Sequence, residues 1–135
     1  MSDTVGVIDI GSNSVKLLVL DGNNVVHRDS VVTRLGTGVN ATGRLSDESI
    51  AATRTRFGEI RSLLDDHGVT NTWAVATAAV RNAANSAPFV DMARNTLGCD
   101  VAVIDGVTEG NLSFLGAQRD LALPPGNGPV TVIDI

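Results

Sequence analysis

The sequence predicts an α/β fold with a mixed five-stranded sheet, in the order β-β-β-α-β-α-β-α. Short runs of β-branched and apolar residues predict the strands. They alternate with longer stretches in which apolar residues recur at helical spacing. Hydrophobic residues make up 43% of the chain and aromatic residues only 3%, so small aliphatic side chains must fill the core. The 135 residues suffice for about one domain.

The first third of the chain is expected to form an antiparallel meander. Residues 4–10, 14–20 and 25–35 are each rich in Val, Leu or Ile, as half-buried strands are. Residues 21–24, Asp-Gly-Asn-Asn, form a typical turn sequence between the second and third of these runs. Because the connections are short, neighbouring strands must run in opposite directions.

The remainder of the chain alternates helices with single strands. A loop is expected at 36–45, which holds three Gly, and Ser46 is expected to cap a helix that ends near Gly68. Repeated β-α-β units favour parallel strands joined by right-handed crossovers. The further elements are predicted as a strand at 72–77, a short helix or turn at 78–85, a helix from Ser86 to Gly98, a strand at 100–105, a helix at 107–121 and a new strand at 130–135.

The charge, cysteine and hydropathy patterns exclude several classes of function. The net charge is −5 and Tyr is absent, so no surface for a nucleic-acid polymer is expected. Cys99 is the one cysteine, which rules out an internal disulfide and a thiolate zinc cluster. The sequence has neither a signal-peptide pattern nor an apolar run of about 20 residues, so we expect no membrane segment and a cytoplasmic location.

The segment that follows the first strand, "DIGSNS" at 9–14, is unusually polar for a hairpin turn. Gly11 allows a sharp turn and the close approach of a ligand. Backbone N–H groups here, with the side chains of Ser12, Asn13 and Ser14, can donate to phosphate oxygens. Asp9 can hold a metal ion or orient an attacking water. On these residues alone, a plain hairpin made of ordinary turn residues remains the alternative.

Three other charged residues stand close to predicted strand ends. Arg81 follows the fourth strand, at the edge where α/β sheets bind ligands, and can hold a phosphate; a solvated surface Arg is the alternative. Glu109 opens the helix after the fifth strand, where it can accept a proton from water or simply stabilise the helix N-terminus. Asp134 ends the last apolar run, and residues 132–135 repeat the Val-Ile-Asp-Ile of 7–10, which indicates a duplicated domain.

Five segments of the chain together resemble a known family. Residues 8–19 look like its first phosphate loop, 34–50 like its Arg-Leu-Gly…Gly-x-Leu segment, and 76–86 like its Ala-Thr-Ser-Ala-x-Arg-x-Ala-x-Asn segment. Residues 103–117 align with Ile-Ser-Gly-Glu-Glu-Glu-Ala, and 130–135 with the strand that enters a second phosphate loop. In this order the segments resemble the exopolyphosphatase and guanosine pentaphosphate phosphohydrolase (Ppx/GppA) family, within the superfamily of actin, sugar kinases and related ATPases.

The resemblance implies a ribonuclease H-like (actin-like ATPase) lobe at residues 1–129 and the first strand of a truncated second lobe at 130–135. It implies an enzyme that releases the terminal phosphate of inorganic polyphosphate or guanosine pentaphosphate, with Mg²⁺ as cofactor. The phosphorylated substrate and the second lobe would then be the partners, and a homodimer is left open. With half of the phosphate clamp missing, the fragment alone is expected to hydrolyse little.

Residue by residue, the resemblance also assigns roles within the site. Glu109 aligns with the general base for the attacking water, and Arg81 with a residue that holds a substrate phosphate. The first phosphate loop would consist of Gly11, Ser12, Asn13 and Ser14, and the metal would be held by Asp9 and Asp134.

The sequence departs from the family pattern just before Glu109, where Val107 and Thr108 thin an acidic run and Asp105 replaces Ser. This departure changes the charge around the expected base. Two alternatives follow. The first is an ATP-dependent kinase lobe of the same superfamily, although the kinases more often read Gly-Thr-Thr/Ser where this chain has Gly-Ser-Asn-Ser. The second is a non-catalytic module that binds polyphosphate or an alarmone.

Overall fold

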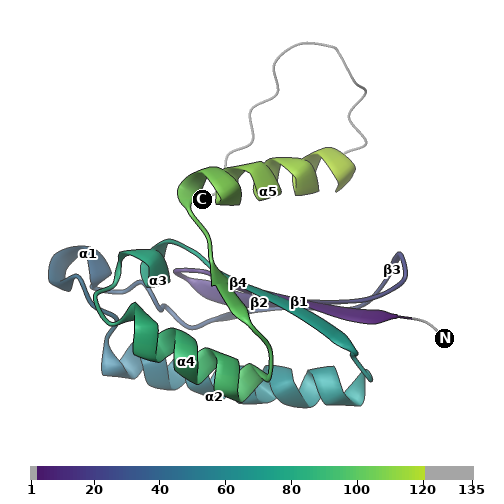
Figure 1. Ribbon diagram of the computed structural model, residues 1–135, viewed down its shortest axis with the longest axis horizontal. Coiled ribbons are helices and arrows are strands. Elements are labelled where there is room, and N and C mark those ends of the chain that lie inside the picture. Colours follow the sequence, from purple (N-terminus) through teal and green to yellow (C-terminus); the bar gives the residue numbers. More distant parts are fainter. Residues whose placement is uncertain (1–2, 121–135) are drawn as a thin grey trace, which may run out of the picture.

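The chain folds around a five-stranded mixed sheet with the strand order β3-β2-β1-β4-β5 (Figure 1). The computed structural model describes residues 3–120. The first three strands form the predicted antiparallel meander, and β4 and then β5 extend the sheet from β1 in parallel. The strands are β1 (Thr4–Ile10), β2 (Ser14–Asp21), β3 (Asn24–Val32), β4 (Asn71–Ala76) and β5 (Val101–Val103).

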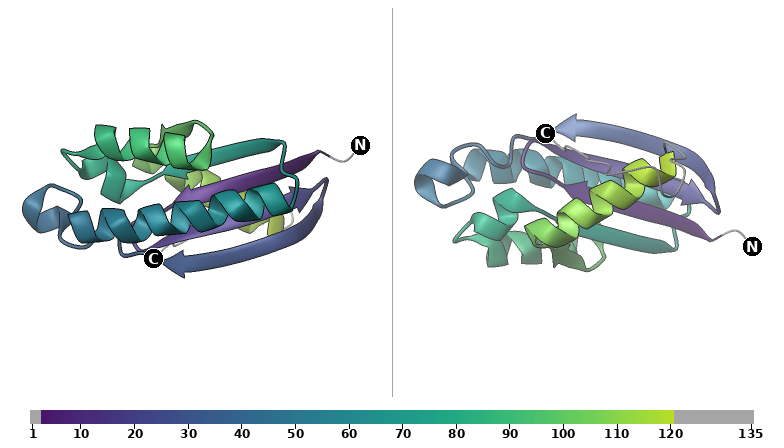
Figure 2. Two further views of the ribbon diagram at one scale, coloured as in Figure 1. Left: turned by 90° about the horizontal axis from the view of Figure 1, so that it is seen from below. Right: turned by 90° about the horizontal axis from the view of Figure 1, so that it is seen from above.

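Two long helices cover one face of the sheet (Figure 2). α2 (Asp47–Asp66) connects β3 to β4, and α4 (Ser86–Leu97) precedes β5. The predicted cap of α2 is confirmed, because the Ser46 hydroxyl accepts a hydrogen bond from the Ser49 N–H at 3.1 Å. Gly98 ends α4 at φ 71°, in the left-handed conformation that glycine adopts without strain.

The pleat of the central strand β1 separates the core from the opposite face. Ile8 and Ile10 are both 0% exposed and belong to the core between the sheet and the helices. Successive side chains of a strand point to opposite faces, so Asp9 lies on the other side of the sheet. The antiparallel register places Lys16 of β2 directly across from Asp9, on that same face.

A final helix, α5 (Gly106–Asp120), lies over this second face, opposite α2 and α4 (Figures 1 and 2). Three of its apolar side chains are largely exposed: Val107 at 74%, Leu112 at 50% and Leu115 at 58%. Apolar burial therefore contributes little to holding α5 in place. Polar contacts near its first turn take on that role.

The observed elements differ from the predicted ones in two connections. The expected loop at 36–45 contains a one-turn helix, α1 (Val39–Thr42), between Gly38 and Gly43, both of which have positive φ. The third strand ends at Val32, earlier than predicted, because the next two N–H groups both turn to the carbonyl of Asn13. The segment predicted as a short helix or turn is a helix, α3 (Ala78–Asn82).

Some predictions fall on the last residues of the chain. The strand at 130–135, with Asp134, lies outside the described residues, and so does the boundary at 129. None of the helices within residues 3–120 combines the length and apolar character that crossing a bilayer requires.

The packing of the core predicts that truncating two different phenylalanines lowers the stability of the protein by very different amounts. Phe57 of α2 is 0% exposed and packs against Phe89 of α4, with ring centroids 6.0 Å apart. We expect Phe57→Ala to lower the free energy of unfolding by about 3–5 kcal/mol, since it leaves a cavity between the helices. The matched change Phe114→Ala, on α5 at 36% exposure, should cost about 1 kcal/mol or less. Urea unfolding followed by circular dichroism measures both, and equal losses would contradict this picture of the core.

Candidate active site

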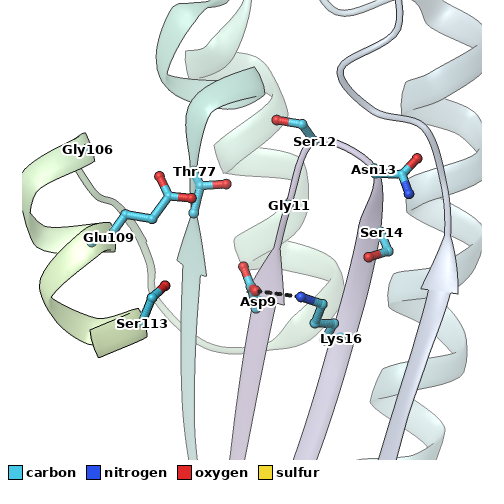
Figure 3. Close-up of a pocket in the computed structure, with 11 residues that line it drawn as sticks. Asp9, Gly11, Ser12, Asn13, Ser14, Lys16, Thr77, Gly106, Glu109 and Ser113 are labelled. Atoms are coloured by element: carbon cyan, nitrogen blue, oxygen red, sulfur yellow. Dashed lines mark ion pairs between the residues drawn. The ribbon is translucent and has the colours of Figure 1, made fainter. Parts of the chain in front are cut away.

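A pocket of about 460 Å³ lies on the second face of the sheet, where the β1–β2 turn, the end of β4 and the start of α5 meet (Figure 3). Its walls come from segments that are far apart in the sequence. On α5, the lining residues recur with the spacing of a single helix face. The pocket is lined by Asp9, Gly11, Ser12, Asn13, Ser14, Lys16, Thr77, Gly106, Glu109, Gly110 and Ser113.

The polar turn that joins β1 to β2 is both a hairpin connection and a wall of the pocket. The Gly11 N–H donates to the Ser14 carbonyl at 3.0 Å and closes the turn. A Cβ at Gly11 would lie 3.0 Å from that same carbonyl oxygen, which explains the glycine. The segment can therefore be both a plain hairpin turn and a ligand-binding loop, since ordinary hairpin geometry presents its polar groups to a cavity.

The turn is held from behind by the segment that follows β3. The Asn13 carbonyl accepts hydrogen bonds from the N–H groups of Thr33 (3.0 Å) and Arg34 (2.9 Å). The Ser12 carbonyl accepts a further bond from the Gly36 N–H at 2.7 Å. These bonds use the carbonyl groups of the turn. Apart from the Gly11 N–H, which closes the turn, its N–H and side-chain groups are of the kind that an anionic ligand requires.

Ser12 also connects the turn to α3. Its hydroxyl oxygen accepts a hydrogen bond from the Ala79 N–H at 3.2 Å. The N-cap residue of α3, Thr77, makes no capping bond with its own side chain, so Ser12 satisfies an N–H group at this helix terminus. The bond uses Ser12 Oγ as an acceptor, which leaves the hydroxyl proton to donate to a ligand.

Asp9 and Lys16 place one negative and one positive charge on the floor of the pocket. The Lys16 ammonium lies 3.9 Å from an Asp9 carboxylate oxygen (Figure 3). Both side chains are about half exposed, at 56% for Lys16 and 42% for Asp9. A half-exposed pair of this kind contributes little to stability, and an anion in the pocket can compete with Asp9 for the ammonium.

Glu109 stands on the α5 wall, and its carboxylate points toward Thr77 (Figure 3). It occupies the first turn of α5, as the sequence predicts. One of its oxygens lies 3.6 Å from Arg81 Nη1, and the two side chains are only 34% and 30% exposed. The same Nη1 donates a hydrogen bond to the Ile104 carbonyl at 2.7 Å. Arg81 thus contacts Glu109 and the chain before α5, and it is not among the lining residues.

The start of α5 is fixed by Asp105, whose carboxylate accepts a hydrogen bond from the Thr108 N–H at 2.7 Å. This is an N-cap bond, for which Asp and Ser are both suited. Asp105, in the place where the family has Ser, therefore preserves the local structure. Hydrogen bonding from Thr108 lowers the pKa of the Asp105 carboxyl below its ordinary value of 3.8.

The oxygen-rich lining is suited to a Mg²⁺ ion only as part of a larger ligand set. Asp9 on the floor and Glu109 on the α5 wall are the two carboxylates of the lining, which also contains hydroxyl and amide oxygens. Mg²⁺ binds one or two carboxylates and completes its shell with water and substrate phosphates. Among residues 3–120, no group of three or more His, Cys, Asp or Glu side chains could hold a metal ion. A Mg²⁺ ion held by Asp9 would therefore take its other ligands from water, from substrate phosphates or from residues outside 3–120, and the second expected ligand, Asp134, is one of the latter.

Comparison with known proteins identifies the family. The model of the Ppx/GppA phosphatase family matches residues 7–135. The chain belongs to this family. Exopolyphosphatase 2 of Mycobacterium tuberculosis is 37% identical over 144 residues, which cover 97% of this chain and 44% of that protein. The guanosine-5'-triphosphate,3'-diphosphate pyrophosphatase of Aliivibrio fischeri is 31% identical over the whole of this chain and 27% of its own length.

Solved structures agree with this membership and with the predicted fold class. The Aquifex aeolicus member of the Ppx/GppA family superimposes with a TM-score of 0.79 at 35% identity, over 89% of this chain and 40% of that one. A hexokinase from Thermus thermophilus shares the fold alone, with a TM-score of 0.52 at 15% identity over 86% of this chain and 38% of that one. The described residues thus have an actin-like ATPase fold. This chain spans less than half the length of the curated relatives above.

The structure brings most of the predicted site residues together. Asp9, Glu109 and the four residues of the turn line one pocket, and Arg81 adjoins it through Glu109. Sequence reasoning missed three lining residues with polar side chains, Lys16, Thr77 and Ser113, and two lining glycines, Gly106 and Gly110. The register of the predicted hairpin could have identified Lys16, since it stands opposite Asp9. The helical repeat could have identified Ser113, which lies one turn beyond Glu109.

The packing of Gly36 against the turn yields a prediction. A Cβ at Gly36 would lie 2.9 Å from Ser12 Cβ and 3.2 Å from the Ser12 carbonyl oxygen, so the two segments must separate. We expect Gly36→Ala to lower stability by about 1–3 kcal/mol and to weaken the binding of phosphate-bearing ligands. Gly58→Ala is the matched control. Gly58 lies inside α2 with open space around it, so this change should stabilise the protein by about 0.5–1 kcal/mol. Chemical denaturation and calorimetry measure the two effects, and a neutral Gly36→Ala would show that the turn does not need this contact.

The capping bond of Asp105 yields a prediction about pH. Because its pKa is lowered in the folded state, the bond stabilises the start of α5 above pH 3.8 and is lost as the pH falls through the folded-state pKa. The Thr108 amide proton signal should therefore titrate in NMR spectra with a midpoint below 3.8. In Asp105→Asn, which keeps an acceptor but no titrating group, the signal should not move. A midpoint at or above 3.8 would contradict the capping role.

Proposed function

We propose that this chain is the N-terminal lobe of a phosphohydrolase that releases the terminal phosphate of inorganic polyphosphate or of guanosine pentaphosphate. The observation that supports it best is the pocket itself, in which a donor-rich turn faces the carboxylate of Glu109 across one cavity. Family membership supports the same reaction class, since relatives carry the names exopolyphosphatase and guanosine-5'-triphosphate,3'-diphosphate pyrophosphatase.

The phosphate would be held by the β1–β2 turn and by Lys16. Apart from the Gly11 N–H, which closes the turn, the N–H groups of the turn and the side chains of Ser12, Asn13 and Ser14 are donors without formal charge. Lys16 adds a cation on the pocket floor. Phosphate oxygens accept charge-assisted hydrogen bonds from such groups. Given the net charge of −5, a local cation is needed to attract a polyanion.

The reaction would be an attack of water on the terminal phosphorus. Glu109 would accept one proton from that water while the new P–O bond forms. The bond to the bridging oxygen would break, and the shortened chain would leave with the electron pair. Positioning and charge stabilisation supply most of the rate in this class of reaction. Mg²⁺, with Asp9 as one ligand and Asp134 expected as another, would neutralise charge on the phosphates.

The 135-residue chain by itself is proposed to hydrolyse little, although it carries the proposed base and the first phosphate loop. The described residues offer only part of a magnesium site, and the relatives are more than twice as long as the matched segment. The rest of the metal site and the opposite wall of the cleft would come from a second lobe. Phosphate release by the isolated chain at the rate of a two-lobed relative would overturn this part of the proposal.

The role of Glu109 can be tested by a neutral substitution in the complete protein. Glu109→Gln should lower kcat by about 10²–10⁴-fold, because the amide cannot accept the proton, while the affinity for substrate changes little. Glu48→Gln is the matched control, since Glu48 also occupies the first turn of a helix but is exposed and outside the pocket. Phosphate release from polyphosphate and from guanosine pentaphosphate, each with Mg²⁺, measures turnover.

The same assay separates the alternatives. Full turnover by Glu109→Gln would remove Glu109 from the role of base. Tight binding of polyphosphate without turnover in the wild-type complete protein would favour a binding module. Transfer of phosphate from ATP to an acceptor, in place of release to water, would favour a kinase.

A further inference from the structure

We propose that Arg81 is a positioning residue that fixes the carboxylate of Glu109 relative to the phosphate-binding turn, and that its main role is not to bind the substrate phosphate. This inference rests on the proposed function of Glu109. It begins from the two contacts of the Arg81 guanidinium, one with the Ile104 carbonyl at 2.7 Å and one with Glu109 at 3.6 Å. Both contacts lie on the segment that leads from β5 into α5.

Within residues 3–120, apolar packing gives this segment little support. β5 has three residues, and α5 leaves much of its apolar surface exposed, including Val107. One backbone hydrogen bond also holds Ile104, whose N–H donates to the Ala76 carbonyl at 3.0 Å. Because Ile104 lies two residues before α5, the bond from Arg81 to its carbonyl helps to fix where Glu109 stands.

The start of α3 is hydrogen-bonded to the phosphate-binding turn that joins β1 to β2. Ala79, near the start of this five-residue helix, donates its N–H to the Ser12 hydroxyl. Arg81 lies in the last turn of the same helix, and its own N–H donates to the Thr77 carbonyl at 2.9 Å. α3 therefore forms a short, rigid link from the group that would hold the phosphate to the group that would activate the water.

The chemistry of the two contacts explains why the position holds an arginine. Both contacts are made by Nη1, whose two N–H groups lie at a fixed angle in the plane of the guanidinium. One of them can donate to the carbonyl while the other faces the carboxylate. A lysine ammonium is a single point charge, so it can reach Ile104 or Glu109 without defining the angle between them. A residue whose only task was to attract a phosphate would not need a bond to a backbone carbonyl.

The test uses Arg81→Lys and Arg81→Ala in the complete protein. A misplacement of Glu109 by about 1 Å should lower kcat by about 10- to 100-fold in both variants. KM and the inhibition constant of the product, inorganic phosphate, should stay within about twofold of wild type. A phosphate ligand would behave in the opposite way, with a large rise in both constants, most of all in Arg81→Ala.

The comparison of kcat with KM and with the inhibition constant of phosphate supplies the readout that a merely structural role would not change. A positioning role lowers kcat and leaves both binding constants near their wild-type values.

Arg61 provides a matched control within the same chain. Its guanidinium also bonds a backbone carbonyl, that of Leu97 at 2.9 Å, and pairs with a carboxylate, that of Asp65. Its side chain is 35% exposed, close to the value of Arg81, but it joins α2 to the end of α4 and not to the pocket. Arg61→Lys and Arg61→Ala should leave kcat, KM and the inhibition constant of phosphate unchanged.

The outcomes separate the failure of this inference from that of the proposed function. A raised KM with wild-type kcat in the Arg81 variants, or no kinetic change at all, overturns the positioning role. An inactive wild type, or an active Glu109→Gln, overturns the proposed function and this inference with it. If Arg81→Ala does not fold, Arg81→Lys alone decides, because it keeps the charge and loses the geometry.

Discussion

The pleat of β1 is the constraint on which the rest of the structure depends. Alternate side chains of this strand must face opposite sides, and the sequence places Ile8 and Ile10 on one side and Asp9 on the other. The apolar side anchors the sheet to α2 and α4. The polar side becomes the floor of the pocket. Since β1 is hydrogen-bonded on both edges, to β2 and to β4, Asp9 is fixed in position by the most enclosed part of the sheet.

The pocket is built mainly by backbone bonds between segments that pack side by side. The turn after β1 gives its carbonyls to the segment after β3, and it receives an N–H from α3 through Ser12. Glu109 approaches from α5, whose start is held by Asp105 and Arg81. Few of these hydrogen bonds lie in the buried core of the protein. The residues of the site are therefore positioned by hydrogen bonds and need no large hydrophobic core of their own.

Much of this could be predicted from the sequence, because the patterns that determine it are local. The strands, the cap of α2 and the polar turn each depend on a few consecutive residues, and the order of motifs carried the family resemblance. The contacts between residues of different elements could not be predicted. The partners of Arg81 depend on where β5 and α5 settle, and the role of Lys16 depends on the register of the hairpin. The one-turn helix α1 was missed because its flanking glycines suggest a loop, yet their positive φ values are what allow the turn to close.

The bond between Ser12 and Ala79 joins residues 67 positions apart, and this separation has a consequence for how the protein is made. The β1–β2–β3 meander pairs only strands that follow one another in the sequence, so it can form while the later strands are still being synthesised. The polar turn then exists as an isolated hairpin loop, exposed to water on every side. It becomes a wall of a pocket only after β4 has paired with β1 and α3 has followed. The pocket thus forms late in folding, and a ligand that binds in it selects chains whose parallel strands have already docked.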